Sequence, residues 1–269
     1  MLRIIDANLN RIGEGLRLLE DITRFILNDA DLSEQLKSMR HELLPKDRLV
    51  REKLLGARQA EEDVGAFLDI PSEAERTDTV SLVSANSRRV QQSLRVLEEV
   101  AKIHGKEFGL DWDKFKHARF NLYMLEQQTV LKLLRHNKKE RVSGLYVIID
   151  TQSLRGRSEV EVAQQAIQGG ARMIQLRDKL RPKGKLVTIS QELKSICTSS
   201  DVLFIVNDYL DIAIASDADG LHIGQEDLPF DIARKTLPGD KILGCSSATL
   251  DEALVAEEQG ADYIAVGSI

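Results

Sequence analysis

The chain has 269 residues, of which 42% are hydrophobic and 30% charged, as is ordinary for a globular protein. Its formal net charge of -6 does not favour general binding to nucleic acid or to a membrane surface. Two cysteines, Cys197 and Cys245, form neither a metal-binding spacing nor a disulfide framework, which fits a reducing cytoplasm. Arg3 and Asp6 interrupt any signal-peptide core, and no apolar run reaches the roughly 20 residues that span a bilayer.

The first half of the chain contains an internal repeat. Residues 7–22 match residues 85–100, with seven identical positions. In each copy the apolar residues recur at helical spacing, as in Ile12, Leu16 and Leu19. A looser match joins residues 36–41 to residues 115–120 and pairs Arg40 with Arg119. The pattern predicts two helical hairpins related by duplication, packed as a pseudo-twofold bundle.

Polar residues recur at matched positions of the two copies, and they are candidate site residues of the helical region. Asn8 and Asn86 are also candidate helix N-caps. The arginines and glutamates either serve a site or bond one helix to another, because ion pairs three residues apart are common on helices. The matched residues are Asn8, Arg11, Arg17 and Glu20 in the first copy and Asn86, Arg89, Arg95 and Glu98 in the second.

A charged, glycine-punctuated connection runs from Asp47 to Pro71. Its first part, Leu49 to Leu55, has helical spacing. Such a long connection is rarely idle in a compact domain. We therefore expect the remainder to fold over one end of the bundle, with Arg58 and Asp63 as candidate ligand contacts.

The pattern of apolar residues changes after a last predicted helix, Asn121 to Leu134. The polar run from His136 to Arg141 predicts a break, which divides the chain into a helical domain, residues 1–137, and a second domain, residues 138–269. Short apolar strands then alternate with helical segments, which predicts a parallel sheet. The expected strands are 144–150, 172–178, 203–208, 220–225, 242–247 and 263–269, and the expected helices are 159–168, 185–197, 209–215, 231–236 and 250–259.

Six strands of this kind predict an incomplete (β/α)8 barrel, so the fold class is α plus α/β. The alternation stops after the sixth strand. Either the sequence is part of a longer protein or the missing strands come from elsewhere, and an open sheet edge favours the first explanation.

A helix is expected to end at Gly169 and Gly170, and the strand that follows carries Gln175, Arg177 and Lys179 at its carboxyl end. Alternate residues of a strand share a face. In parallel α/β folds ligands bind at the carboxyl ends of the strands. The set is either a binding site for a phosphate ester or a solvated basic strand end.

Two aspartates follow neighbouring strands. Asn207 and Asp208 end the third strand, and Asp227 follows the fourth. Carboxylates at adjacent strand ends either cap turns or converge on a hard cation, and the basic residues nearby favour Mg²⁺ bound with a diphosphate. Ser246, after the fifth strand, is a further candidate for a phosphate contact, whereas His222 either contacts phosphate or packs inside the barrel.

This second domain resembles the thiamine-phosphate synthases. The resemblance rests on several runs that together span residues 144–269. They are Gly144-Leu145-Tyr146-Val147-Ile148-Ile149-Asp150, Gln175-Leu176-Arg177-Asp178-Lys179, Asn207-Asp208, Ala218-Asp219-Gly220-Leu221-His222-Ile223-Gly224-Gln225-Glu226-Asp227-Leu228-Pro229 and Gly260-Ala261-Asp262-Tyr263-Ile264.

The resemblance implies a reaction that couples hydroxymethylpyrimidine diphosphate to a thiazole phosphate and releases diphosphate. By that likeness Gln175, Arg177, Lys179 and Asn207 bind the pyrimidine diphosphate, and Ser246 contacts its diphosphate. Arg177, Lys179 and Ser246 are then the catalytic candidates. Asp208 and Asp227 would hold Mg²⁺.

The chain departs from the family pattern in two ways. It lacks the loop after the sixth strand together with the last two strands, and it has Asp178 where the family tends to have Glu. A related barrel, the thiazole tautomerase, is an alternative, but it is not expected to carry both metal carboxylates.

The duplicated helices, with Arg58 and the run Asp63-Val64-Gly65, resemble the helical domain that is fused ahead of thiamine-phosphate synthases. That resemblance covers residues ~1–135 and implies phosphorylation of hydroxymethylpyrimidine phosphate, with ATP as a second substrate. The alternative is a regulatory or homo-oligomerisation module beside an inactive barrel.

Overall fold

The computed structural model describes residues 1–58 and 77–267. The chain divides into two compact units, Met1–Leu133 and Leu134–Ile269, which we term the helical unit and the β/α unit. Among the described residues, no helix is both long enough and apolar enough to cross a membrane.

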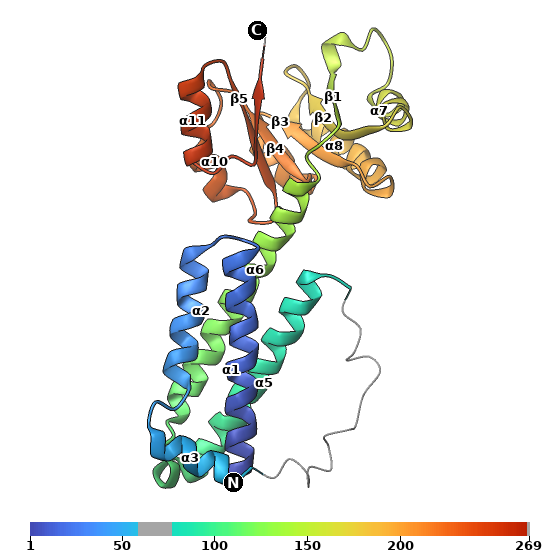
Figure 1. Cartoon of the computed structure of the whole chain (residues 1–269). Helices are drawn as coiled ribbons and strands as arrows, with labels where there is room; N and C mark the ends of the chain where they lie inside the picture. Colours follow the sequence, from blue (N-terminus) through green and yellow to red (C-terminus); the bar gives the residue numbers. More distant parts are fainter. Residues whose placement is uncertain (59–76, 268–269) are drawn as a thin grey trace. The chain divides into compact units, whose positions relative to one another are not determined.

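The helical unit is built from long helices (Figure 1). They are α1 (Leu2–Phe25), α2 (Ala30–Leu43), α3 (Arg48–Gly56), α5 (Thr79–Phe108) and α6 (Trp112–Glu140). The apolar positions that predicted the repeated helices form its core, since Ile12, Leu16, Val90 and Leu94 have no exposed surface. Gly15 lets α1 approach α5 closely, because a Cβ atom there would lie 2.4 Å from Val90 Cγ2.

Two expectations about helix ends are wrong. Asn8 and Asn86 are not N-caps, because α1 begins at Leu2 and α5 begins at Thr79; each instead donates its side-chain amide to a carbonyl four residues earlier, that of Ile4 or Leu82. The N-cap of α5 is Asp78, whose side chain accepts the backbone N–H of Ser81 in a capping box.

The polar run from His136 does not interrupt the chain but continues α6 to Glu140. Arg135 pairs with Asp262, and Lys138 pairs with Asp240, both within the β/α unit. Lysine and arginine are good helix formers. The charges that indicated a break therefore anchor the end of the helix instead.

The β/α unit contains a parallel sheet in which each strand pairs with the next along the chain, in the order β1-β2-β3-β4-β5-β6. Its strands agree with the predicted set to within two or three residues. They are β1 (Leu145–Asp150), β2 (Ala171–Arg177), β3 (Leu203–Asn207), β4 (Gly220–Ile223), β5 (Ile242–Ser247) and β6 (Tyr263–Val266).

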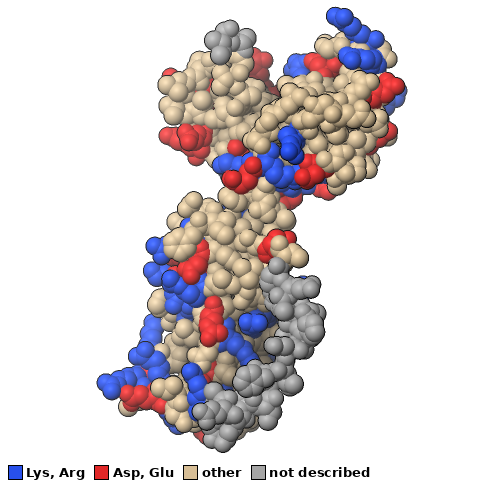
Figure 2. All heavy atoms as spheres, turned by 45° about the vertical axis from the view of Figure 1, so that its right-hand side comes forward, with Lys and Arg blue, Asp and Glu red and all other residues tan. Residues whose placement is uncertain are grey.

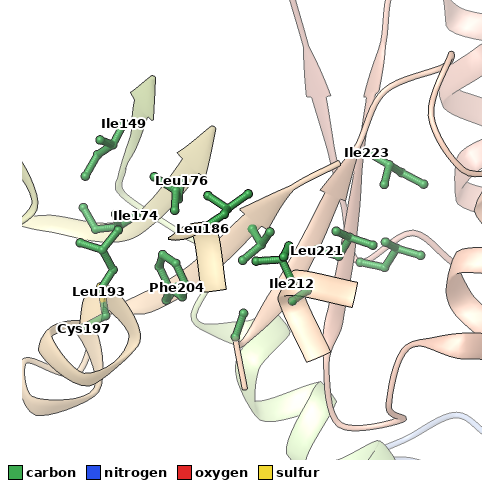
Figure 3. Packing of buried hydrophobic residues seen from close by; sticks show 14 of the residues in the cluster. Ile149, Ile174, Leu176, Leu186, Leu193, Cys197, Phe204, Ile212, Leu221 and Ile223 are labelled. Carbon is green, nitrogen blue, oxygen red and sulfur yellow. The ribbon is translucent and has the colours of Figure 1, made fainter. Parts of the chain in front are cut away.

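Helices cover one face of this sheet. Figure 3 shows side chains of the strands, such as Ile174, Phe204 and Leu221, meeting Leu193 and Ile212 of the helices. The helices of this unit are η2 (Thr151–Ser153), α7 (Glu159–Gln168), α8 (Lys183–Ser199), α9 (Leu210–Ala215), α10 (Phe230–Thr236) and α11 (Leu250–Glu258). As predicted, the helix stops at the glycine pair: Gly169 is the C-cap of α7, and Gly170 follows with a φ of +92°.

The opposite face carries the alternate side chains of the same strands. Met173, Leu203, Ile205 and Ile242 form a separate buried cluster there. Further along each strand this face becomes polar, because the next residues on it include Gln175, Asn207, His222 and Ser246. The alternation thus places polar groups over an apolar floor, at the carboxyl edge of the sheet.

Candidate active site

The basic residues at the end of β2 reach carboxylates on both neighbouring strands. Arg177 pairs with Asp150, the last residue of β1. Lys179 Nζ lies 3.6 Å from Asp208 Oδ2, just after β3. Gln175 is buried and donates a hydrogen bond of 2.7 Å to the Tyr146 hydroxyl. The three residues therefore span the sheet edge from β1 to β3, and Arg177 has a carboxylate partner that the motif did not predict.

Asp208 and Asp227 come together at the same edge, as the sequence predicted. Asp208 takes a left-handed backbone conformation, φ +62°, which is uncommon for a residue other than glycine. Its N–H bonds the His222 carbonyl at 2.8 Å, which ties the turn to β4. Asp227 Oδ2 accepts the backbone N–H of Gly224 at 2.7 Å. Backbone hydrogen bonds thus fix the turn that carries Asp208 and hold the Asp227 carboxylate directly.

Electrostatics show that the two carboxylates share one environment. Burial raises the pKa of the Asp208 carboxyl, and the adjacent Asp227 carboxylate raises this pKa further, against the opposing charge of Lys179. Two like charges held together in a partly buried place favour a bound cation.

Asn207 and Ser246 lie on the same sheet face. Asn207 is 8% exposed, and its side chain has no hydrogen-bond partner in the described part of the chain. Ser246 Oγ lies 2.9 Å from His222 Nε2, and its carbonyl accepts the Gln225 side-chain amide at 2.7 Å. The Asn207 side chain is therefore free to contact a ligand, and the Ser246 hydroxyl is oriented by a neighbour.

A chain of hydrogen bonds crosses the interior beneath these residues. It runs from Gln175 to the Tyr146 hydroxyl, then 2.9 Å to the Tyr263 hydroxyl, 3.2 Å to His222 Nδ1, and on to Ser246. The Tyr263 ring stacks on the His222 ring at 5.6 Å and packs over Gly244, where a Cβ atom would lie 2.1 Å from the Tyr263 ring. This series of hydrogen bonds links side chains from five of the six strands.

Burial determines the protonation states of the side chains in this hydrogen-bonded series. Burial lowers the pKa of His222 to about 4 and raises the pKa of Tyr146 to about 12. The imidazole is therefore neutral near pH 7, with one donor and one acceptor nitrogen. One of the Ser246 and Tyr263 hydroxyls consequently donates to the ring, and the other accepts from it.

Sequence reasoning did not find Tyr146, Tyr263 or Asp150 as site residues. Each occurs within a run that carries the family resemblance. The signal that was available is the period of two, because Tyr146 and Asp150 are four residues apart on the face that also carries Gln175 and Arg177. His222, for which packing and phosphate contact were both open, is packed inside and bonded to Ser246.

In the helical unit the matched polar residues form two ion-pair clusters between helices. Glu20 binds Arg17 of its own helix and Arg40 of α2, with Arg40 Nη2 at 2.8 Å. Glu98 binds Arg95 and, at 3.0 Å, Arg119 of α6. Both glutamates are buried. Inter-helix bonding, one of the two predicted alternatives, thus accounts for Glu20 and Glu98, whereas Arg17 and Arg95 pair with them from the same helix.

The other helical candidates are placed separately. Arg11 and Arg89 are exposed and have no partner within the described residues. Arg58 pairs with Asp6 of α1 at 2.8 Å. Asp63 lies outside the described residues. Among the described residues, no hydrogen bond or ion pair joins the candidates of the first copy to those of the second.

A parallel α/β sheet with basic, amide and acidic side chains at its carboxyl edge is typical of the class of enzymes that bind their ligands at that edge. The comparisons with known proteins narrow this class. A family model described as thiamine monophosphate synthase matches residues 145–269, and a model of the ThiD2 family matches residues 3–128.

Curated relatives match both units together. Thiamine-phosphate synthase of Thermosynechococcus vestitus is 36% identical over 267 residues, which cover 99% of this chain and 74% of that protein. The Synechocystis sp. enzyme of the same name is 38% identical, with the same coverage. A solved thiamine phosphate pyrophosphorylase from Pyrococcus furiosus is 39% identical over 49% of this chain and 63% of that chain, with a TM-score of 0.46. The chain belongs to the thiamine-phosphate synthase family, and it is a transferase.

We predict that the His222 imidazole stays neutral well below pH 6. Its pKa of about 4 lies below the ordinary value of about 6.5, so the unfolded chain takes up the proton first as the pH falls. The neutral imidazole therefore stabilises the β/α unit fully above pH 6.5, and this stability is lost progressively as the pH falls toward 4. The His222 Cε1 resonance, followed by NMR, should not titrate between pH 7 and 5. A midpoint near 6.5 would contradict the packing described.

Proposed function

We propose that the β/α unit forms thiamine phosphate by coupling hydroxymethylpyrimidine diphosphate to hydroxyethylthiazole phosphate, with release of diphosphate. The observation that carries this proposal is the Asp208–Asp227 pair facing Lys179 at the strand ends. A site that separates diphosphate from carbon needs positive charge where negative charge accumulates, and it has little need of a strong base.

The diphosphate is proposed to bind along the edge from β2 to β5. Arg177 and Lys179 supply cationic hydrogen-bond donors, and their partners Asp150 and Asp208 hold them in place before the ligand arrives. The Asn207 amide and the Ser246 hydroxyl supply neutral contacts. Gln175, fixed by Tyr146, is proposed to contact the pyrimidine diphosphate from deeper in the site.

The residues at this edge fit Mg²⁺. Its preferred ligands are carboxylate oxygens, and Asp208 and Asp227 offer two carboxylates whose mutual repulsion a divalent cation would relieve. When bound there, Mg²⁺ would neutralise charge on the departing diphosphate. The chain's own contribution is to fix the turn at Asp208 through its N–H bond to the His222 carbonyl and to hold the Asp227 carboxylate through the N–H of Gly224.

The proposed chemistry balances without a protein nucleophile. The bond between the pyrimidine methylene carbon and the diphosphate oxygen breaks, and diphosphate leaves with the electron pair. The pyrimidine ring stabilises the resulting cation, which the thiazole nitrogen captures to form the new C–N bond. Arg177 and Lys179 stabilise the leaving group. His222 is neutral and is committed to Ser246 and Tyr263, so it holds the Ser246 hydroxyl in position rather than acting as a base.

We also propose the finer architecture of each unit. The order β1 to β6 contains no reversal, which is the arrangement of a (β/α)8 barrel rather than of a doubly wound sheet. The two matched clusters, Arg17–Glu20–Arg40 and Arg95–Glu98–Arg119, support a bundle made of two duplicated hairpins.

For the helical unit we propose a second function, the ATP-dependent phosphorylation of hydroxymethylpyrimidine phosphate. The ThiD2 match over residues 3–128 supports an activity separate from that of the β/α unit. The expected result is that the full-length chain converts ATP to ADP in proportion to added hydroxymethylpyrimidine phosphate. The absence of turnover in a chain that still makes thiamine phosphate would favour the regulatory or oligomerisation alternative.

We predict that Asp208→Asn lowers the rate of thiamine phosphate formation by at least about a hundredfold, because it removes a group that places charge at the leaving diphosphate. The amide keeps the size of the side chain and can still accept a hydrogen bond. Steady-state assays with Mg²⁺ check the result. Asp231→Asn, on the exposed surface of α10, serves as the control and should retain wild-type activity. Full activity of Asp208→Asn would contradict the assignment.

A further inference from the structure

A second cationic pocket, of about 660 Å³, lies in the helical unit between α1, α2 and the segment that contains α3. Figure 1 shows α3 lying across the ends of α1 and α2, and Figure 2 shows Lys and Arg side chains gathered along one edge of this unit. Four cationic side chains line the pocket, Arg40, Lys46, Arg51 and Arg58, against one carboxylate, Asp6. The pocket therefore favours an anionic ligand.

Two of these arginines are held in fixed orientations by buried carboxylates of α1. Arg40 donates from Nε and Nη2 to Glu20 Oε2, at 3.1 and 2.8 Å. Arg58 donates from Nε and Nη2 to the two oxygens of Asp6, at 2.8 and 3.0 Å. Within the described residues neither Nη1 has a protein partner, so each guanidinium keeps one donor group for a ligand. Such pre-ordering lowers the entropic cost of binding an anion.

The remaining cations of the pocket are unpaired. Lys46 and Arg51 are exposed and have no ion-pair partner within the described residues. By contrast, Arg48 on the same helix as Arg51 pairs with Glu52. The positive charge is thus concentrated at the pocket rather than spread evenly over α3.

One wall of the pocket is apolar. Leu9, Leu44 and Leu54 line it, and Leu9 and Leu54 are buried core residues. A free inorganic ion would gain nothing from this wall, whereas an apolar planar ring would bury surface against it. The combination favours a phosphate group carried on a small ring.

In the second copy of the repeat, the arginine that corresponds to Arg40 has no free Nη1 donor. Arg119, the counterpart of Arg40, also binds a buried glutamate, but its Nη1 donates to the Tyr123 hydroxyl at 3.2 Å. Four residues after Arg40 the chain has Leu44 instead of tyrosine. Among the described residues, the Nη1 group of Arg40 in the first copy thus has no partner, whereas that of Arg119 in the second copy is bonded to Tyr123.

We propose that the pocket formed by Arg40, Lys46, Arg51 and Arg58 binds a phosphomonoester of a small planar ring compound. The proposal that this pocket is the substrate site of the helical unit rests on the phosphotransfer proposed above. The proposal that it binds such a phosphomonoester depends only on the contacts described here.

The test uses the full-length chain without Mg²⁺ and three probes: phenyl phosphate, inorganic phosphate and phenol. Binding is followed by NMR through the imidazole of His41, which lines the pocket, while the His222 resonance reports on the β/α unit. Phenyl phosphate should shift the His41 signal and bind more tightly than either other probe. Phenol binding as tightly as phenyl phosphate would overturn the proposal.

Matched double variants complete the test. Lys46→Gln with Arg51→Gln should weaken phenyl phosphate binding by about tenfold or more, because two charged donors are lost. Arg48→Gln with Lys53→Gln removes the same charge from the same segment outside the pocket, and it should bind as the wild type does. Equal binding by both double variants would overturn the proposal.

Turnover separates this proposal from the phosphotransfer proposal. If phenyl phosphate binds as expected and hydroxymethylpyrimidine phosphate is not phosphorylated, the pocket stands and the phosphotransfer proposal fails. If phosphorylation proceeds unchanged in the Lys46→Gln, Arg51→Gln variant, phosphotransfer stands and the pocket is not its substrate site.

Discussion

The proposed function of the β/α unit depends on two carboxylates that lie side by side. Asp208 and Asp227 follow adjacent strands. The backbone N–H of Asp208, a left-handed residue, bonds the His222 carbonyl, and the Asp227 carboxylate accepts the N–H of Gly224. Like charges in a partly buried place are costly, as the raised pKa of Asp208 shows. In the proposed function a divalent cation balances this negative charge, and Lys179 already supplies part of the balancing charge.

The rest of the β/α unit serves this edge. On the sheet face opposite the helices, apolar side chains come first along the strands. The neutral hydrogen-bonded side chains follow them, and the charged groups lie at the carboxyl ends of the strands. The middle layer positions side chains without adding charge, because His222 stays neutral and the tyrosine hydroxyls stay protonated. On this face of the sheet the charged groups therefore lie at the carboxyl ends of the strands, where the diphosphate is proposed to bind.

The period of two and the β/α alternation predicted the sheet and most of its helices, because both follow from local residue spacing. Partners distant in the sequence were less accessible. Nothing local indicates that Asp150 pairs with Arg177 or that Tyr263 reaches His222, since both contacts depend on strand register. In the helices, the asparagine positions suggested caps, yet helical residues upstream extend both helices. The repeat did indicate the polar positions that became inter-helix ion pairs.

The most direct test of the central claim is to count divalent cations with Mn²⁺, which electron paramagnetic resonance detects when free in solution. In the presence of diphosphate, the full-length protein should bind one Mn²⁺ per chain at the strand ends. A variant with both Asp208→Asn and Asp227→Asn should lose that ion while it keeps its fold by circular dichroism. The same Mn²⁺ stoichiometry and affinity in this variant would contradict the account.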